Sequence, residues 1–211
     1  MNIILLGQIT SGKGTLAEAL HEKYGFELVS IGALLREETK KNTGEAKIID
    51  EYQRDGRLVP EEIVLKVLKK HIEQANGKNL LFDGYPRNLK QAQTLDKISS
   101  VDAVLVLDVD DSIVEERFMG RRGCSDCGHI THIRIVKESM LCPKCGGTLE
   151  IRNDMTKEAM INKMKSFETE TKPIIGFYEA KGKTYHIDAG KNPETTLKQA
   201  EQILERVSKN G

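Results

Sequence analysis

Apolar positions along the chain fall into two alternating patterns. Short continuous apolar runs, bounded by turn-forming residues, predict buried strands over residues 2–6, 79–82 and 103–109, and weaker runs predict strands over 26–30 and 184–187. Apolar residues with helical spacing predict helices over residues 15–23, 60–73, 112–119, 157–167 and 194–207. Because strands and helices alternate, we expect an α/β fold with a five-stranded parallel sheet and helices on both faces.

Two segments interrupt this alternation. Residues 31–59 contain polar helical material and no strand, and residues 121–155 contain all four cysteines with little helical pattern. We expect a core made of residues 1–29, 60–120 and 156–211. Residues 30–59 and 121–155 are expected to stand off this core as two small, mobile subdomains.

Composition narrows the classes of function. The chain has 211 residues, with 32 basic and 32 acidic side chains and a formal net charge of zero, so no overall field attracts nucleic acid or an anionic membrane. No apolar run approaches membrane-spanning length, and the first run is too short for a signal peptide. We expect a cytoplasmic monomer that binds neither nucleic acid nor membranes.

The first strand is followed by the loop GQITSGKGT, from Gly7 to Thr15. Its outer glycines and Lys13 fit the pattern G-x-x-x-x-G-K-[ST] of phosphate-binding loops, and the predicted strand, loop and helix provide the required context. Glycines let backbone N–H groups converge on phosphate oxygens, and a lysine adds a positive charge. Gly14 replaces the hydroxyl that usually binds Mg²⁺, so the metal must be held elsewhere.

Cationic side chains follow the other predicted strands. They are Arg36, then Arg87 after Asp83, then Arg117 and Arg121, which share a helix face, and finally Arg152 and Lys163. In open α/β sheets ligands bind beyond the carboxyl ends of the strands, so these charges are expected to meet at one edge. Transfer of a phosphoryl group between two polyanions needs such an array. Asp83 is placed to orient the water shell of Mg²⁺.

All four cysteines lie in two Cys-x-x-Cys pairs separated by fourteen residues: Cys124, Cys127, Cys142 and Cys145. In a reducing compartment this spacing predicts a tetrahedral zinc site rather than disulfides. Four thiolates leave no open position on the metal, so we expect structural zinc. His129 and His132 lie nearby, and neither is needed as a ligand.

Several motifs together resemble the adenylate kinase family: GxxxxGKGT, S-x-G-x-x-L-R at residues 30–36, G-x-L-V at 56–59, DGYPR at 83–87 followed by Gln91, and GRR at 120–122. Their order and spacing extend over nearly the whole chain. The resemblance implies a P-loop NTPase-type three-layer fold. It also implies Mg²⁺-dependent transfer of the ATP γ-phosphoryl group to AMP, which gives two ADP. Residues 30–59 would bind AMP, and residues 121–155 would form a zinc-containing lid over ATP.

The resemblance also assigns roles to residues. The catalytic residues would be Lys13, Arg87, Arg121, Arg152 and Lys163. The ATP-binding residues would be Thr10, Ser11, Gly12, Lys13, Gly14, Thr15, Arg117, Arg121, Ile130 and Thr131. The AMP-binding residues would be Ile31, Arg36, Arg57, Leu58, Val59, Gly84, Tyr85, Pro86, Arg87, Gln91, Arg152 and Lys163. The Gln91 amide carries both a donor and an acceptor for the adenine edge.

The chain departs from the family pattern at five places, one of which is Met155, where the family has an aspartate after Arg152. Ile9 and Thr10 replace Pro-Gly, and a positive φ there would cost Thr10 about 1–2 kcal/mol. Ile31 replaces a threonine of the AMP pocket, and Thr131 replaces a tyrosine of the lid. Lys163 replaces an arginine, which keeps the charge and loses the bidentate fork, so we expect a slower enzyme.

Three alternatives stay open on the sequence alone. Ile31 allows a monophosphate kinase with another acceptor preference. Thr10 and Lys163 allow a nucleotide-binding regulator with degraded catalysis. The paired Cys-x-x-Cys unit also occurs in zinc ribbons that bind nucleic acid, but here it lacks interleaved aromatic residues for base stacking.

Overall fold

The computed structural model describes residues 1–41, 43–54, 59–136, 139–151 and 156–210. Its centre is a five-stranded sheet in the order β2-β3-β1-β4-β8, and every neighbouring pair is parallel. The strands are β1 (Asn2–Gly7), β2 (Glu27–Ser30), β3 (Leu80–Asp83), β4 (Ala103–Asp108) and β8 (Thr184–Asp188). The predicted five-stranded parallel sheet is therefore confirmed.

Side chains of each central strand alternate between two hydrophobic clusters, as the period of two in a strand requires. Ile4 of β1 and Val104 of β4 belong to one cluster, and their neighbours Ile3 and Leu105 belong to the other. All four are fully buried. Both faces of the sheet must therefore be covered, which explains why these strands appear in the sequence as continuous apolar runs.

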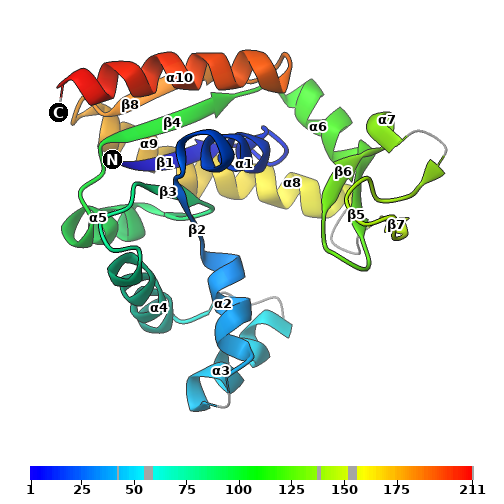
Figure 1. Ribbon diagram of the computed structural model, residues 1–211, viewed down its shortest axis with the longest axis horizontal. Helices are drawn as coiled ribbons and strands as arrows, with labels where there is room; N and C mark the ends of the chain where they lie inside the picture. Colours follow the sequence, from blue (N-terminus) through cyan, green and yellow to red (C-terminus); the bar gives the residue numbers. More distant parts are fainter. Residues whose placement is uncertain (42, 55–58, 137–138, 152–155, 211) are drawn as a thin grey trace.

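Helices cover the sheet as two outer layers (Figure 1). One face is covered by α1 (Lys13–Tyr24) and α10 (Pro193–Asn210), which share a cluster with the strands. The other face carries α4 (Glu61–Gln74), α5 (Leu89–Ile98) and α9 (Lys172–Glu179). The helix α8 (Lys157–Ser166) reaches α9 through the π-helical segment η2 (Phe167–Thr171). These layers confirm the three-layer fold.

Two groups of elements project from these layers (Figure 1). The first contains α2 (Ile31–Thr39) and α3 (Gly44–Arg54), which lie within the segment expected to bind AMP. The second follows α6 (Asp111–Gly120) without a break. It contains β5 (Arg121–Cys124), β6 (Ile130–His132), the short α7 (Ile133–Val136) and β7 (Leu149–Glu150), whose strands form an antiparallel sheet in the order β6-β5-β7.

All of the strands and helices predicted from apolar spacing are present, with ends shifted by up to three residues. Helices α5 and α9, the short α7 and the small antiparallel sheet are absent from those predictions. Helix α5 buries only Ala92 and Leu95, and α9 contains Pro173 and Gly176, so neither has a clear helical signal. Among the helices in the described ranges, none is long and apolar enough to cross a membrane.

Candidate functional site

The loop after β1 lies at the centre of the sheet, where connections leave in opposite directions. β1 is flanked by β3 on one side and β4 on the other, which is the position where α/β sheets bind ligands. Gly7 lets the loop turn tightly, because a Cβ there would lie 2.7 Å from the Ser11 hydroxyl and 2.8 Å from the Leu107 carbonyl oxygen. The left-handed Gly12 caps α1, which leaves the first amides of the helix available to an anion.

Lys13 turns back over this loop. Its ammonium nitrogen lies 2.8 Å from the Gly7 carbonyl oxygen, 2.7 Å from the Gln8 carbonyl oxygen and 3.3 Å from the Ser11 hydroxyl. Burial of the ammonium lowers the pKa of Lys13 to about 8, although the residue as a whole is partly exposed. The carboxylate of Asp83 acts in the opposite direction, and the Arg121 guanidinium lowers this pKa further. The loop, β3 and β5 therefore bring two cations and a carboxylate close together.

The expected ATP residues occupy the loop and the outlying sheet. Ser11 is almost fully buried, whereas Gly14 and Thr15 are exposed on the first turn of α1. Thr10 has a φ of 55°, so it adopts the positive φ that is costly for a residue other than glycine. Ile130 and Thr131 lie on β6, where they pair with Gly123 and Arg122 of β5.

Arg117 has contacts that the sequence did not predict. Its guanidinium donates hydrogen bonds to three successive carbonyl oxygens, those of Ala189 at 2.9 Å, Gly190 at 3.1 Å and Lys191 at 3.2 Å. These residues form the loop after β8. In these hydrogen bonds the loop contributes backbone carbonyl oxygens, so no side-chain pattern in the sequence indicates the contact. The contact joins α6 to the edge of the sheet.

The expected AMP residues lie around the end of β3 and on α2. Arg87 folds over its own turn, with its Nε donating to the Gly84 carbonyl oxygen at 2.9 Å. The Arg87 backbone N–H donates to Gln91 Oε1 at 2.8 Å, and a carbonyl oxygen can accept a second hydrogen bond. Tyr85 and Pro86 are buried, and the peptide bond between them is cis.

On the side of α2, Ile31 is buried at the start of the helix, and the Arg36 guanidinium lies over Gly32, in contact with the position of a Cβ there. The partly buried side chain of Val59 packs against the core cluster. Lys163 lies on α8 with its ammonium 5.7 Å from the centre of the Phe118 ring. Three expected site residues lie outside the described residues: Arg57, Leu58 and Arg152.

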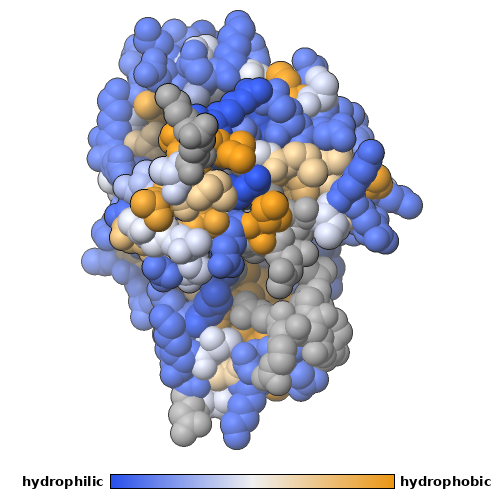
Figure 2. Space-filling view, turned by 90° about the vertical axis from the view of Figure 1, so that its right-hand side faces the viewer, coloured by the Kyte–Doolittle hydropathy of each residue, from blue (hydrophilic) through white to orange (hydrophobic). Residues whose placement is uncertain are grey.

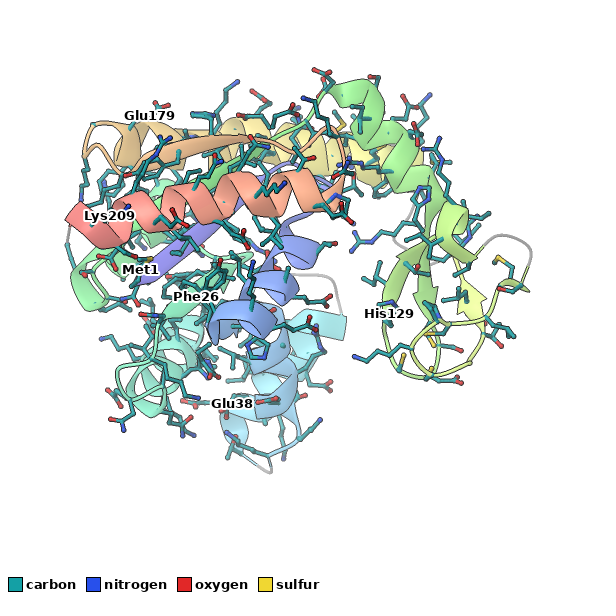
Figure 3. The ribbon with its side chains drawn as sticks, turned by 45° about the horizontal axis from the view of Figure 1, so that its top comes forward. Met1, Phe26, Glu38, His129, Glu179 and Lys209 are labelled. Atoms are coloured by element: carbon teal, nitrogen blue, oxygen red, sulfur yellow. The ribbon has the colours of Figure 1, made fainter. Side chains whose placement is uncertain are left out.

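A cavity lies beside the expected site, and most of its charged lining residues are acidic, which disfavours a nucleotide. Its volume is about 700 Å³, and it is bounded by the ends of β4 and β8 together with η2 and α9. Its acidic lining residues are Asp108, Asp110, Glu168, Glu179 and Asp188; Glu179 is labelled in Figure 3. His186 joins this wall, and its hydrogen bond with Asp108 raises the pKa of the imidazole. A polyphosphate is therefore better matched by the loop after β1.

The four cysteines meet beside the outlying sheet. The backbone N–H of Cys124 donates to the carbonyl oxygen of His129, which is labelled in Figure 3. The four sulfur atoms all lie within 4.8 Å of one another, with 3.5 Å between Cys124 and Cys145 and 3.7 Å between Cys127 and Cys142. A disulfide would need about 2.05 Å. A tetrahedron with zinc–sulfur bonds of about 2.3 Å has edges of about 3.8 Å, so the donor set fits such an ion.

Hydrogen bonds from backbone amides favour the thiolate form of two of these cysteines. The N–H groups of Cys127 and Asp126 lower the pKa of Cys124 to about 7. At Cys145 the Gly147 N–H acts in the same direction, but the other three thiols raise the pKa to about 12. Four sulfurs this close resist becoming four anions together, and a bound cation would remove that repulsion.

The junction between α6 and the outlying sheet is tightly packed. A Cβ on Gly120 would lie 2.0 Å from Nε2 of His132, so only glycine admits the imidazole there. Beyond this junction the outlying unit exposes four large apolar side chains: Ile133, Ile135, Leu141 and Ile151. Figure 2 shows separate apolar patches on the face of the molecule that it displays. The buried cluster of the outlying unit is small, with Val136 and Leu149 beside Cys124 and Cys142.

Comparisons with known proteins match nearly the whole chain. A family model described as adenylate kinase matches residues 5–183. An adenylate kinase of Archaeoglobus fulgidus is 37% identical over 215 residues, which cover 98% of this chain and 99% of that protein. An adenylate kinase of Clostridium tetani is 35% identical over 212 residues, covering 97% of this chain and 98% of the relative.

The lowered pKa of Lys13 predicts that polyphosphate affinity depends on pH. A bound anion stabilises the ammonium form of Lys13. Polyphosphate affinity is therefore highest below the ligand-free pKa of about 8 and falls as the pH rises above that pKa. Between pH 7 and pH 9 the dissociation constant of a MgATP analogue should rise roughly tenfold. Calorimetric titration at several pH values measures this change.

Lys13→Arg is the control, because arginine stays charged over this whole range. The variant should show weaker but nearly pH-independent binding. An equally steep pH dependence in Lys13→Arg would show that another group titrates.

Proposed function

The chain belongs to the adenylate kinase family, and from that membership we propose that the loop after β1 and the strand-end cations carry out the reaction ATP + AMP to two ADP. The family identifies the chain as an ATP:AMP phosphotransferase. The observation that best supports our assignment of residues is the Lys13 ammonium, held in the phosphate-binding loop beside Asp83 and Arg121.

On the ATP side, the proposed ligands of the phosphates are the loop amides from Thr10 to Thr15 and the Lys13 ammonium. The ammonium now bonds carbonyl oxygens of its own loop, and phosphate oxygens would replace those weaker acceptors. Magnesium bound with ATP supplies charge neutralisation on the phosphates. Asp83 would hold its water shell, since it offers a carboxylate oxygen near Lys13.

On the AMP side, Arg36 and Arg87 are proposed to bind the acceptor phosphate, and Gln91 the adenine edge. Both arginines now lie over glycines of their own segments, Gly32 and Gly84, from which a phosphate can draw them. Arg121, Arg152 and Lys163 would then neutralise the phosphoryl group during transfer. Catalysis of this kind depends on positioning and charge rather than on a covalent intermediate.

We further propose that the cysteine cluster binds structural zinc. Residues 121–155 would form a lid over ATP, and residues 30–59 would close over AMP, so that water does not hydrolyse ATP. The remaining residues would form the core. We place the enzyme in the cytoplasm as a monomer, in keeping with free thiols and a neutral net charge.

The proposed function predicts acceptor selectivity. With MgATP, the chain should form ADP from AMP at least tenfold faster than it forms diphosphates from GMP, CMP or UMP, because Gln91 pairs with adenine. A coupled assay of ADP formation measures all four rates. Preference for a non-adenine acceptor would refute the AMP assignment, and a rate equal to that of Lys13→Ala would refute the activity.

Lys163 predicts that the wild-type enzyme is slower than an arginine variant. Lys163→Arg restores a bidentate donor, and one charge-assisted hydrogen bond of about 1.5–3 kcal/mol corresponds to roughly a ten- to hundredfold change in rate. The ring of Phe118 suits either cation. Steady-state kinetics should show a higher kcat. Lys165→Arg, on the exposed side of the same helix, is the matched control.

The zinc assignment predicts one zinc ion per chain. Cys142→Ser should lose the ion and the antiparallel sheet, because structural zinc contributes about 10–16 kcal/mol to the folding of small zinc peptides and the local core is small. Elemental analysis and amide hydrogen exchange of β5 and β6 measure the two effects. Ser125→Ala changes a non-ligand between the first two cysteines and should keep both; a Cys142→Ser chain that retains zinc and protection contradicts the assignment.

A further inference from the structure

The first half of the phosphate-binding loop is tied to helix α6 by two side chains. Gln8 Nε2 donates to Asp111 Oδ1 at 2.9 Å, and Thr10 Oγ1 lies 3.1 Å from the Val114 carbonyl oxygen. Asp111 and Val114 are three residues apart, so they lie on one face of the helix. Alternate residues of the loop therefore contact successive turns of α6.

The Thr10 contact accompanies an unfavourable backbone conformation. A β-branched residue with a φ of 55° is sterically strained, and such conformations persist only where surrounding contacts determine them. The Thr10 hydroxyl has a single proton, which the Ile9 carbonyl oxygen also approaches at 2.7 Å. Among the hydrogen bonds of the described residues, the Thr10 hydroxyl reaches another element at Val114, so this contact can hold Thr10 in its left-handed conformation.

We propose that Thr10 and Gln8 are positioning residues that hold the ATP-binding loop on α6. This inference rests on the proposed function and adds a mechanism for shaping the ATP site. Helix α6 also carries Arg117 and continues into β5, which begins with Arg121. The two hydrogen bonds from Gln8 and Thr10 therefore fix the position of the loop amides relative to Arg117 and Arg121. Their loss should weaken ATP binding and leave AMP binding unchanged.

The principal test compares Thr10→Val with Thr10→Ser. Valine keeps the branched shape and loses the hydroxyl, whereas serine keeps the hydroxyl. Thr10→Val should raise the KM for MgATP by roughly five- to tenfold, the effect expected for one lost hydrogen bond. The KM for AMP should change less than about twofold, and Thr10→Ser should restore most of the ATP affinity.

Thr94→Val is the matched control, because the Thr94 hydroxyl also donates to a helix carbonyl, that of Lys90, at 2.9 Å on α5. It should alter neither KM. Equal KM values for MgATP in the Thr10→Val and Thr94→Val chains would overturn the inference. A rise in both nucleotide KM values together with a lower Tm would also overturn it, since that pattern indicates a general structural role.

A double-mutant cycle tests the second tie independently of how Thr10→Val folds. Gln8→Ala and Asp111→Ala should each raise the dissociation constant of MgATP. The dissociation constant of the double variant should not exceed that of the single variant with the larger increase. Additive effects would overturn the Gln8 assignment. Binding is measured by calorimetry, so the cycle remains informative if the wild type forms no ADP, which would refute the proposed function alone.

Discussion

A buried ammonium group surrounded by backbone carbonyl oxygens is the interaction on which the site depends. The loop after β1 enfolds Lys13, and burial there disfavours the charge that phosphate binding needs. The carboxylate of Asp83 offsets part of that cost, and the carbonyl oxygens of Gly7 and Gln8 accept hydrogen bonds from the ammonium. The parallel sheet makes this possible, since its registers bring the ends of β1 and β3 side by side.

The same physical reasoning shows which parts of the fold the sequence could predict. Central strands such as β1 and β4 are buried on both faces and so are continuous apolar runs, which a single sequence displays well. Helix α9 contains Pro173 near its start and Gly176 within it, and both residues oppose the helical prediction. The small antiparallel sheet buries little apolar area, so its strands follow from the meeting of four cysteines rather than from periodicity.

For the site, residues with a fixed local context were predictable and contacts between distant elements were not. Spacing alone placed Lys13 in the loop after the first strand and grouped the four cysteines, and the loop pattern indicated the cost that a positive φ would have for Thr10. The three hydrogen bonds from Arg117 to the loop after β8 join residues more than seventy positions apart through backbone acceptors. Every residue type carries a backbone carbonyl oxygen, so the sequence does not indicate this contact and the tertiary structure is needed to see it.

Helix α6 contacts two of the residues at which the chain departs from the family pattern. Thr10 contacts Val114 and Lys163 contacts Phe118, and these two partners are four residues apart on α6. A left-handed threonine costs about 1–2 kcal/mol. The Thr10 hydrogen bond stabilises the fold by about 0.5–1.5 kcal/mol. A glycine at this position would lower the stability by about 0.4–1 kcal/mol, because it increases the conformational entropy of the unfolded chain. These terms nearly cancel, so threonine can replace glycine with little loss of stability, provided that α6 supplies the acceptor. The two residues therefore attach the loop and α8 to α6.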